Sequence, residues 1–377
     1  MDKHTVERIK QYFKDNREAL VNDLLTLMKA DSPTGNVEAC NKCADVLCGM
    51  IKDRLGIDAA RLPQEKFGDH ITFEAGSGER KVLLIGHYDT VWPVGSKETT
   101  FDGNIVKGPG CFDMKYGDIS IIWALKALSD LDIPLGKNVK VVYNSDEEFG
   151  SLTSKPVILD MAAGCDAAVI LEPSADGALK TQRKGVGMIT VEVEGIPSHA
   201  GTDYTSGVSA IDEAAKIVSY LHSLTDLEKG TTVNVGIISG GTARNVVAAA
   251  CTLKVDFRVT TAAAADDLFK KVNAIRPSRE GIKLDITCEF NRPPFERTPG
   301  NVMVYEFAQK LAADFGYEIS EISVGGGSDG NFTSFEGIPT LDGLGAVGAG
   351  GHAWHEYTDI DKSLERTALL CAFLTEF

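Results

Sequence analysis

A histidine and a carboxylate, His87 and Asp89, follow directly on the apolar run Val82–Ile85. Apolar, β-prone residues in succession indicate a strand that is buried on both faces. Gly86 ends the run, so both side chains emerge at the carboxyl end of that strand, where ligands bind in open α/β sheets. A His-x-Asp pair at this place suits a metal ligand and the carboxylate that orients its ring. Taken alone, the pair is equally consistent with a core histidine that a neighbouring aspartate satisfies.

Further segments end a strand-like apolar run or a glycine-rich loop in carboxylates or histidines. A single acidic run is usually a solvated loop, but most of these segments follow strands of one presumed sheet and should converge on one edge. Carboxylates gathered in a partly buried cleft repel one another unless a cation neutralises them. Imidazole together with carboxylate suits zinc, with cobalt or manganese as alternatives, so the pattern predicts one or two divalent ions. The residues concerned are Asp113, Glu147, Glu148, Glu172, His352 and His355.

Strand-like and helix-like segments alternate around these residues. Strands are expected at residues 71–75, 82–85, 139–143 and 167–171, with a long amphipathic helix at 119–131. Helical spacing also covers residues 4–30 and, after the break at Ser32–Gly35, residues 37–53. This alternation predicts an α/β sheet that is flanked by helices.

The pattern changes near Gly185, where apolar and polar residues begin to alternate as in a half-exposed strand. From there to residue 290 the expected order is β-α-β-β-α-β, which is that of a ferredoxin-like unit. Helix and strand alternation resumes from Gly300. We therefore expect a first domain formed by residues 1–183 and 294–377, with residues 184–293 inserted as a smaller α+β domain.

Composition and net charge limit the classes of function that the protein can have. The formal net charge of the 377-residue chain is −16, a field that repels nucleic acid and anionic membranes. The first residues carry charges and resemble no signal peptide, and no apolar run reaches the length of a membrane span, so a cytoplasmic protein is expected. Cys40, Cys43 and Cys48 fall on one stripe of an expected helix, which favours reduced, buried thiols over a metal site.

Taken together, the motifs resemble those of the di-zinc exopeptidase and deacylase family. They are GHYDTVW, GPGCFDMKYGD, NSDEEFGS, LEPS, SHAG and HAWHEY, in the family's order and over nearly the whole chain. The family includes glutamate carboxypeptidase, which the chain resembles most, as well as acetylornithine deacetylase, succinyl-diaminopimelate desuccinylase, aminoacylase and tripeptidase. The resemblance implies a mixed-sheet catalytic domain with an inserted ferredoxin-like lid, through which two copies form a homodimer.

The resemblance also implies a ligand set for two divalent ions, most readily zinc. Asp113 would bridge the two ions, His87 and Glu172 would complete one site, and Glu148 and His352 would complete the other. The family's histidine stands four or five residues before the glutamate of a closing Glu-aromatic pair. Counting back from Glu356 selects His352 and leaves His355 as a rim or packing residue.

Catalytic roles follow from the same resemblance. Asp89 would orient His87, and Glu147 would be the general base that acts on a metal-bridging water and then protonates the leaving amine. His199 of the SHAG motif would donate a hydrogen bond to the tetrahedral intermediate, often across a dimer interface. The alternative for His199 is a polar residue in a tight turn after a strand, but its place in the SHAG motif favours the functional role.

Substrate-binding residues are expected mainly in the inserted domain. Asn245 and Arg258 would hold a terminal carboxylate, and Gly326 belongs to a glycine-rich loop whose amides can approach a ligand. Arg292 either binds the substrate side chain or is an exposed charge in a proline-rich hinge. Trp92, where deacylases have a smaller residue, would add an aromatic wall to the pocket.

The leading hypothesis is therefore a metallo-carboxypeptidase that releases a C-terminal amino acid, with glutamate favoured. The alternative is an N-acyl-amino-acid amidohydrolase of the deacetylase or desuccinylase type. Either enzyme acts on a small peptide or an N-acyl amino acid. A metal-binding homologue without turnover is disfavoured, because every expected ligand and the base are present.

Overall fold

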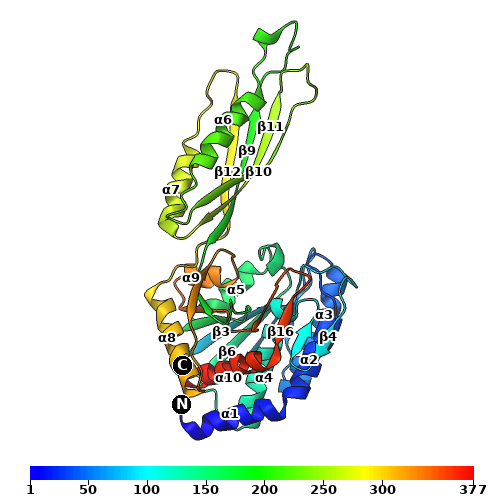
Figure 1. Cartoon of the computed structure of the whole chain (residues 1–377), viewed down its shortest axis with the longest axis vertical. Coiled ribbons are helices and arrows are strands. Elements are labelled where there is room, and N and C mark those ends of the chain that lie inside the picture. Colours follow the sequence, from blue (N-terminus) through cyan, green and yellow to red (C-terminus); the bar gives the residue numbers. More distant parts are fainter. The chain divides into compact units, whose positions relative to one another are not determined.

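The apolar runs expected to be strands form neighbouring strands of an eight-stranded mixed sheet (Figure 1). Strand β3 lies between β6 and β7 and runs parallel to both, whereas β2 pairs antiparallel with β6. The mixed α/β fold predicted from the sequence is confirmed. The computed structural model describes all residues from Met1 to Phe377. In sheet order the strands are β1 (Ala60–Leu62), β2 (His70–Ala75), β6 (Asn138–Asn144), β3 (Lys81–His87), β7 (Ala167–Ile170), β14 (Thr340–Asp342), β8 (Leu179–Arg183) and β13 (Glu321–Val324).

Helices cover both faces of this sheet. Successive residues of a strand point to opposite faces, so Val82 and Leu84 belong to one apolar cluster while Leu83 and Ile85 belong to another. The larger cluster holds helices α1 (Lys3–Asp15), α2 (Arg17–Lys29), α3 (Val37–Leu55), α4 (Tyr116–Asp130), α8 (Pro299–Asp314) and α10 (Ile360–Glu376). The smaller cluster includes residues of α5 (Lys155–Ala162) and α9 (Gly330–Phe335).

Two expected helices differ from the sequence interpretation. The spacing over residues 4–30 belongs to two helices, because Asn16 between α1 and α2 leaves the helical conformation. The stretch 119–131 was expected to be amphipathic, but α4 is buried on nearly every side between the sheet, α3 and α10. Its approach to β7 requires glycine, since a Cβ atom at Gly117 would lie 2.1 Å from the carbonyl oxygen of Leu171.

A small antiparallel sheet joins segments that are far apart in the sequence. Its strands are β15 (Gly348–Ala349), β16 (Tyr357–Asp359), β5 (Ile105–Lys107) and β4 (Thr100–Asp102), in that order. The pairing of β16 with β5 brings the turn between β15 and β16 beside the loop that follows β5. The larger unit that contains both sheets comprises Met1–Gln182, Arg297–Val324 and Ser328–Phe377.

Residues Arg183–Glu296, together with Gly325–Gly327, form a second compact unit. Its elements are β9 (Gly185–Glu194), α6 (Ala210–Ser223), β10 (Thr232–Gly240), β11 (Ala250–Val259), α7 (Ala262–Asn273) and β12 (Lys283–Arg292). The strands form an antiparallel sheet in the order β10-β11-β9-β12, and both helices pack on one apolar face of it. This order of elements is that of a ferredoxin-like unit.

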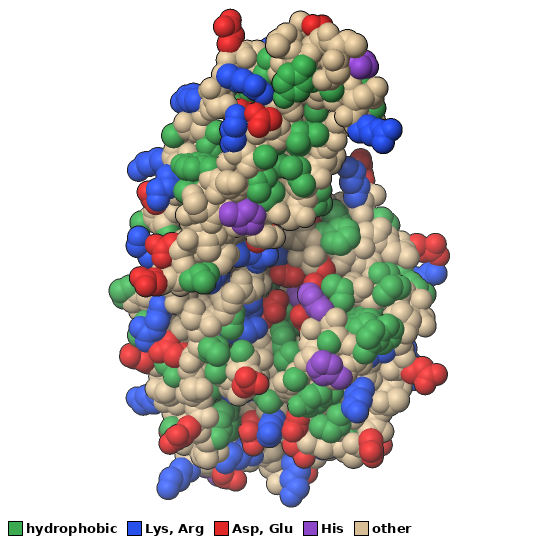
Figure 2. All heavy atoms as spheres, turned by 45° about the horizontal axis from the view of Figure 1, so that its top comes forward, with side chains coloured by type: hydrophobic (Ala, Val, Ile, Leu, Met, Phe, Trp, Pro, Cys, Tyr) green, Lys and Arg blue, Asp and Glu red, His purple; other side chains and the backbone are tan.

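Charged side chains of both signs are interspersed over the face that Figure 2 shows, and acidic side chains lie beside a histidine at one place on it. No helix in the chain combines the length and apolarity that crossing a bilayer requires. All eight cysteines are free, and Cys40 and Cys43 are buried on α3.

Candidate metal centre and catalytic residues

His87 lies at the carboxyl end of β3, with acidic residues from both neighbouring strands around it. Glu147 and Glu148 follow β6 on one side, and Glu172 follows β7 on the other. The imidazole is buried, and its Nε2 lies 3.5 Å from Glu172 Oε1. The parallel arrangement of β6, β3 and β7 therefore gathers one histidine and several carboxylates at one sheet edge.

Asp113 links His87 to His352. Asp113 Oδ1 lies 3.3 Å from His87 Nε2, and Asp113 Oδ2 lies 3.4 Å from His352 Nε2. His352 Nε2 also lies 2.9 Å from an oxygen of Glu148. The two oxygens of one carboxylate thus face two different histidines, which is the arrangement that a bridging ligand needs. His355 lies on the same turn, but the histidine that contacts Asp113 and Glu148 is His352.

The donor set fits divalent cations. The buried Nε2 of His87 has no hydrogen-bond partner, although carboxylate oxygens surround it. Two groups have ligand atoms that lie within 4.8 Å of one another: His87, Glu147 and Glu172, and His87, Asp113 and Glu148. An orphaned imidazole nitrogen that faces several acids is the environment that a metal ion satisfies.

The acids and histidines of the centre shift one another's pKa values. Burial raises the pKa of Glu148 to about 7, although His352 opposes the shift. Hydrogen bonds to Asp113 and Glu148 raise the pKa of His352 to about 11. Burial would raise the pKa of Asp113, but His352 and His87 outweigh it and hold that pKa well below its usual range. The two histidines therefore act as the counter-charges of the acids in the metal-free protein.

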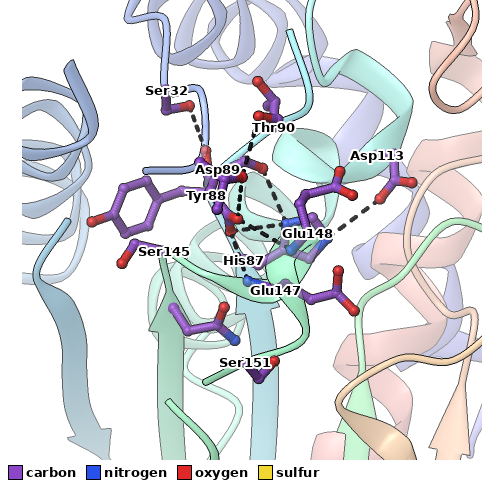
Figure 3. Close-up of polar contacts among 12 residues, drawn as sticks. Ser32, His87, Tyr88, Asp89, Thr90, Asp113, Ser145, Glu147, Glu148 and Ser151 are labelled. Carbon is purple, nitrogen blue, oxygen red and sulfur yellow. Dashed lines mark hydrogen bonds and ion pairs between the residues drawn. The ribbon is translucent and has the colours of Figure 1, made fainter. Parts of the chain in front are cut away.

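Asp89 supports the centre from behind (Figure 3). Its carboxylate is fully buried, and Oδ1 lies 3.4 Å from His87 Nδ1, whose nearer partner is the Asp89 carbonyl at 3.1 Å. Asp89 also accepts hydrogen bonds from the backbone N–H groups of Glu147 and Glu148 and from the hydroxyl of Thr34. The sequence predicted only the contact with His87, since nothing local links residue 89 to the loop after β6.

Trp92, which the sequence predicted to add an aromatic wall to the pocket, is buried. Its side chain is only 7% exposed, because its indole N–H is turned inward and donates to Glu356 Oε2 at 2.8 Å. The exposed aromatic is Trp354, which is 71% exposed and packs on Trp92 with ring centroids 5.2 Å apart. Sequence reasoning missed Trp354, which lies between His352 and His355 in the closing motif.

In the second unit, His199 and Asn245 lie on neighbouring segments. The backbone N–H of Ala200 donates to the Asn245 carbonyl, and the backbone of His199 forms an isolated antiparallel β-bridge with Val246. His199 Nδ1 accepts from the backbone N–H groups of Gly201 and Thr202, both at 3.1 Å. Because Nδ1 accepts, the neutral ring carries its proton on Nε2, which is then the donor.

Arg258 already has a carboxylate partner. Its Nε and Nη2 donate to the two oxygens of Asp256, each at 3.1 Å, on the same strand. Asp256 stands two residues before it in the sequence, where side chains of a strand share a face. A substrate carboxylate would therefore have to share or displace this pair.

Arg292 is not the exposed hinge charge that one interpretation of the sequence allowed. It is only 4% exposed at the end of β12, and a Cβ atom at Gly327 would lie 2.6 Å from Arg292 Cδ. Arg183, which the sequence analysis missed, donates to the carbonyl oxygens of Gly326 and Gly327 at 3.3 and 3.0 Å. Two buried arginines thus pack against the glycine-rich loop.

Comparisons with known proteins agree with this picture. Residues 83–376 match the family model described as peptidase family M20/M25/M40. The chain is 28% identical over 360 residues to carboxypeptidase G2 from Pseudomonas sp. (strain RS-16), an alignment that covers 92% of this chain and 86% of the relative. It is 31% identical over 222 residues to acetylornithine deacetylase from Myxococcus xanthus, which covers 55% of each chain.

The fold is also that of solved structures. The crystal structure of a tripeptidase (SAV1512) from Staphylococcus aureus subsp. aureus Mu50 superposes with a TM-score of 0.77 at 25% identity, and covers 96% of this chain and 98% of that one. The family match spans most of the chain, from β3 to α10, and so includes every segment that forms the centre. This chain therefore belongs to the M20/M25/M40 peptidase family and is a metallopeptidase-type hydrolase.

Proposed function

We propose that this protein is a metal-dependent exopeptidase that hydrolyses the amide bond next to a C-terminal amino acid, with glutamate as the favoured residue. The observation that carries the proposal is Asp113, whose two carboxylate oxygens face His87 and His352 separately. A carboxylate so placed suits a pair of divalent ions better than one ion. The similarity to carboxypeptidase G2 over most of both chains supports the carboxypeptidase assignment.

The residues that would hold two ions, with zinc favoured, are those expected from the sequence. Asp113 would be shared, His87 and Glu172 would complete one position, and Glu148 and His352 would complete the other. The contacts of 3.3 to 3.5 Å between His87 Nε2 and Asp113 and Glu172 support the first position. Such ions supply Lewis-acid polarisation of the scissile carbonyl and a water of lowered pKa.

Glu147 is the proposed general base. It shares with His87 and Glu172 a space in which the ligand atoms lie within 4.8 Å of one another, so its carboxylate is within reach of a water held there. Glu147 would take a proton from that water and deliver it to the nitrogen of the leaving amine. Asp89 would keep Glu147 and His87 in register through its contacts with both.

His199 is the proposed donor to the developing oxyanion. Its Nδ1 accepts two backbone hydrogen bonds, so Nε2–H is free to donate without a prior change of tautomer. Asn245, on the adjacent segment, and Arg258 would bind the substrate carboxylate, while Arg292 and Gly326 would bind its side chain. Arg258 and Arg292 are cationic, which supports an anionic substrate, although Asp256 already pairs with Arg258.

A second candidate function is an N-acyl-amino-acid amidohydrolase of the acetylornithine deacetylase or succinyl-diaminopimelate desuccinylase type. The 31% identity to acetylornithine deacetylase favours it, and the same centre would serve it. Both reactions cleave an amide next to an amino acid. They differ in the acyl group and in the amino acid side chain that the protein must recognise.

A substrate panel separates the two functions. Metal-loaded protein is assayed with N-acyl-glutamates, small peptides, acetylornithine and succinyl-diaminopimelate, and amino acid release is measured. Release of glutamate from N-acyl-glutamates or peptides is expected. Rapid release from acetylornithine or succinyl-diaminopimelate alone would overturn the carboxypeptidase assignment in favour of the second candidate.

The base is tested by Glu147→Gln. Because the amide cannot accept the proton, kcat should fall by about 10²–10⁴-fold while the bound metal per chain stays at the wild-type value. Metal content is measured on the same preparation by elemental analysis. Loss of metal together with activity would instead make Glu147 a ligand, and unchanged turnover would remove it from the mechanism.

A further inference from the structure

Glu356 is a fully buried carboxylate in contact with several donors from distant parts of the chain. Its Oε1 accepts the backbone N–H groups of Phe112 and Asp113 at 3.1 and 3.2 Å. Its Oε2 accepts the Trp92 indole N–H at 2.8 Å and the Gly110 N–H at 3.3 Å. Both oxygens are thus used by two N–H donors each, so this carboxylate is not available to be a metal ligand itself.

These donors belong to segments that carry residues of the candidate centre. Phe112 and Asp113 are in the loop that supplies the shared carboxylate, and Trp92 follows the His87–Asp89 segment by three residues. Glu356 itself closes the turn that begins at Gly350 and carries His352, with its own N–H donating to Ala353. One buried side chain therefore ties the His352 turn to the Asp113 loop and to the chain after β3.

The residues around Glu356 and the His352 turn are closely packed. A Cβ atom at Gly350 would lie 2.9 Å from Glu356 Cα, and one at Gly351 would lie 3.2 Å from Asp113 Oδ2. Lys97 Nζ lies 3.5 Å from Glu356 Oε2 and 4.4 Å from the centre of the Trp92 ring. Lys97 thus balances the buried charge of Glu356, and its side chain is itself only 8% exposed.

We propose that Glu356 is a positioning residue that holds the Asp113 loop and the His352 turn at the separation that two divalent ions require. The inference rests on the proposed ligand roles of Asp113 and His352. Three of the four N–H groups that Glu356 accepts lie in residues 110–113, so they orient the backbone that presents the shared carboxylate. Since Asp113 would serve both positions, loss of Glu356 weakens binding of both ions.

The test is metal affinity of the metal-free protein, measured by calorimetric titration with Zn²⁺ and, separately, Mn²⁺. Glu356→Gln keeps the shape of the side chain but turns an NH₂ group toward N–H donors. With either metal, binding at both positions of the centre should be about 10–100-fold weaker. Glu213→Gln is the matched control. Glu213 is a buried carboxylate of the second unit that accepts the N–H and hydroxyl of Ser278, and its substitution should leave metal affinity unchanged.

A milder variant keeps the test decisive if Glu356→Gln fails to fold. Trp92→Phe removes the indole N–H that Glu356 accepts, and it should lower the metal affinity at both positions by a smaller factor. Wild-type metal affinity in whichever of these variants folds would overturn the proposal, as would weaker binding at only one of the two metal positions. A wild-type protein that binds neither Zn²⁺ nor Mn²⁺ would overturn it too. Because no substrate is used, a protein that binds both ions but hydrolyses none of the panel would refute the proposed function and leave this assignment standing.

Discussion

At the residue scale, the candidate centre is a buried imidazole with acidic side chains around it. His87 Nε2 is buried without a hydrogen-bond partner, while its Nδ1 is held by Asp89. The acids around it would repel one another in the absence of a cation. Asp89 is the residue that makes this arrangement rigid, because it contacts both His87 and the backbone of the two glutamates after β6.

Asp89→Asn should therefore lower both the stability of the protein and its metal affinity, in addition to disturbing the orientation of His87. Whichever way the amide is turned, its NH₂ group faces the backbone N–H of Glu147 or Glu148, which costs about 1–3 kcal/mol of stability. Metal affinity should fall by about 10–100-fold. Chemical denaturation and metal titration measure the two effects.

Thr34→Val is the control for this substitution. It removes a single hydroxyl donor to Asp89 Oδ2 and leaves the contacts with His87 and the glutamates in place. Its cost should be about 0.5–1.5 kcal/mol with little change in metal affinity. Equal effects of the two substitutions on metal affinity would contradict the role given to Asp89.

At the scale of elements, the carboxyl ends of parallel strands supply one part of the centre and the small sheet supplies the other. Strands β6, β3 and β7 deliver Glu147, Glu148, His87 and Glu172. The pairing of β16 with β5 brings together Asp113 and His352 from segments that are far apart in the sequence. The turn that carries His352 is tight, with left-handed backbone at Gly350 (φ 84°) and at His352 itself (φ 63°).

Gly350→Ala should disturb this turn. A side chain disfavours the left-handed conformation, and the added Cβ would also meet the backbone of Glu356 at 2.9 Å. We expect a loss of about 1–3 kcal/mol in stability together with weaker metal binding. Thermal unfolding with and without metal measures both.

Gly316→Ala separates strain from crowding. Gly316 has φ 89°, but a Cβ atom there would meet nothing within 4 Å. It should show the conformational cost alone and normal metal affinity. If the two variants bind metal equally well, the geometry of the His352 turn is not what sets affinity.

At the scale of the whole molecule, the second unit offers an unpaired sheet edge. Strand β10 lies at the edge of its sheet, and Ile237 and Ile238 on it are 60% and 54% exposed. Apolar residues on an open edge favour pairing with another chain. We propose that two copies associate through this edge.

Ile238→Asp should convert a dimer to a monomer, because a charge at the edge opposes strand pairing. Sedimentation equilibrium gives the mass, and circular dichroism shows whether the fold is kept. Met188→Asp is the control, since Met188 is 50% exposed but lies on the inner strand β9. A wild-type monomer, or dissociation by Met188→Asp but not Ile238→Asp, would exclude this edge as the interface.

Local patterns in the sequence are enough to predict the α/β class and the strands β2, β3, β6 and β7, because apolar periodicity and glycine breaks are local properties, whereas the family resemblance implied the mixed sheet. The sequence also predicted which side chains stand at the ends of these strands, since the order of the chain states this directly. The inward-facing indole of Trp92, the ion pair of Asp256 with Arg258, and the burial of α4 on nearly every side became visible only in the folded structure. Its strand pairing places residues 105–107 beside 357–359 and so brings Asp113 beside His352, a proximity that the family resemblance implied but no local pattern predicted. These outcomes depend on contacts between segments far apart in sequence, which a local pattern does not encode.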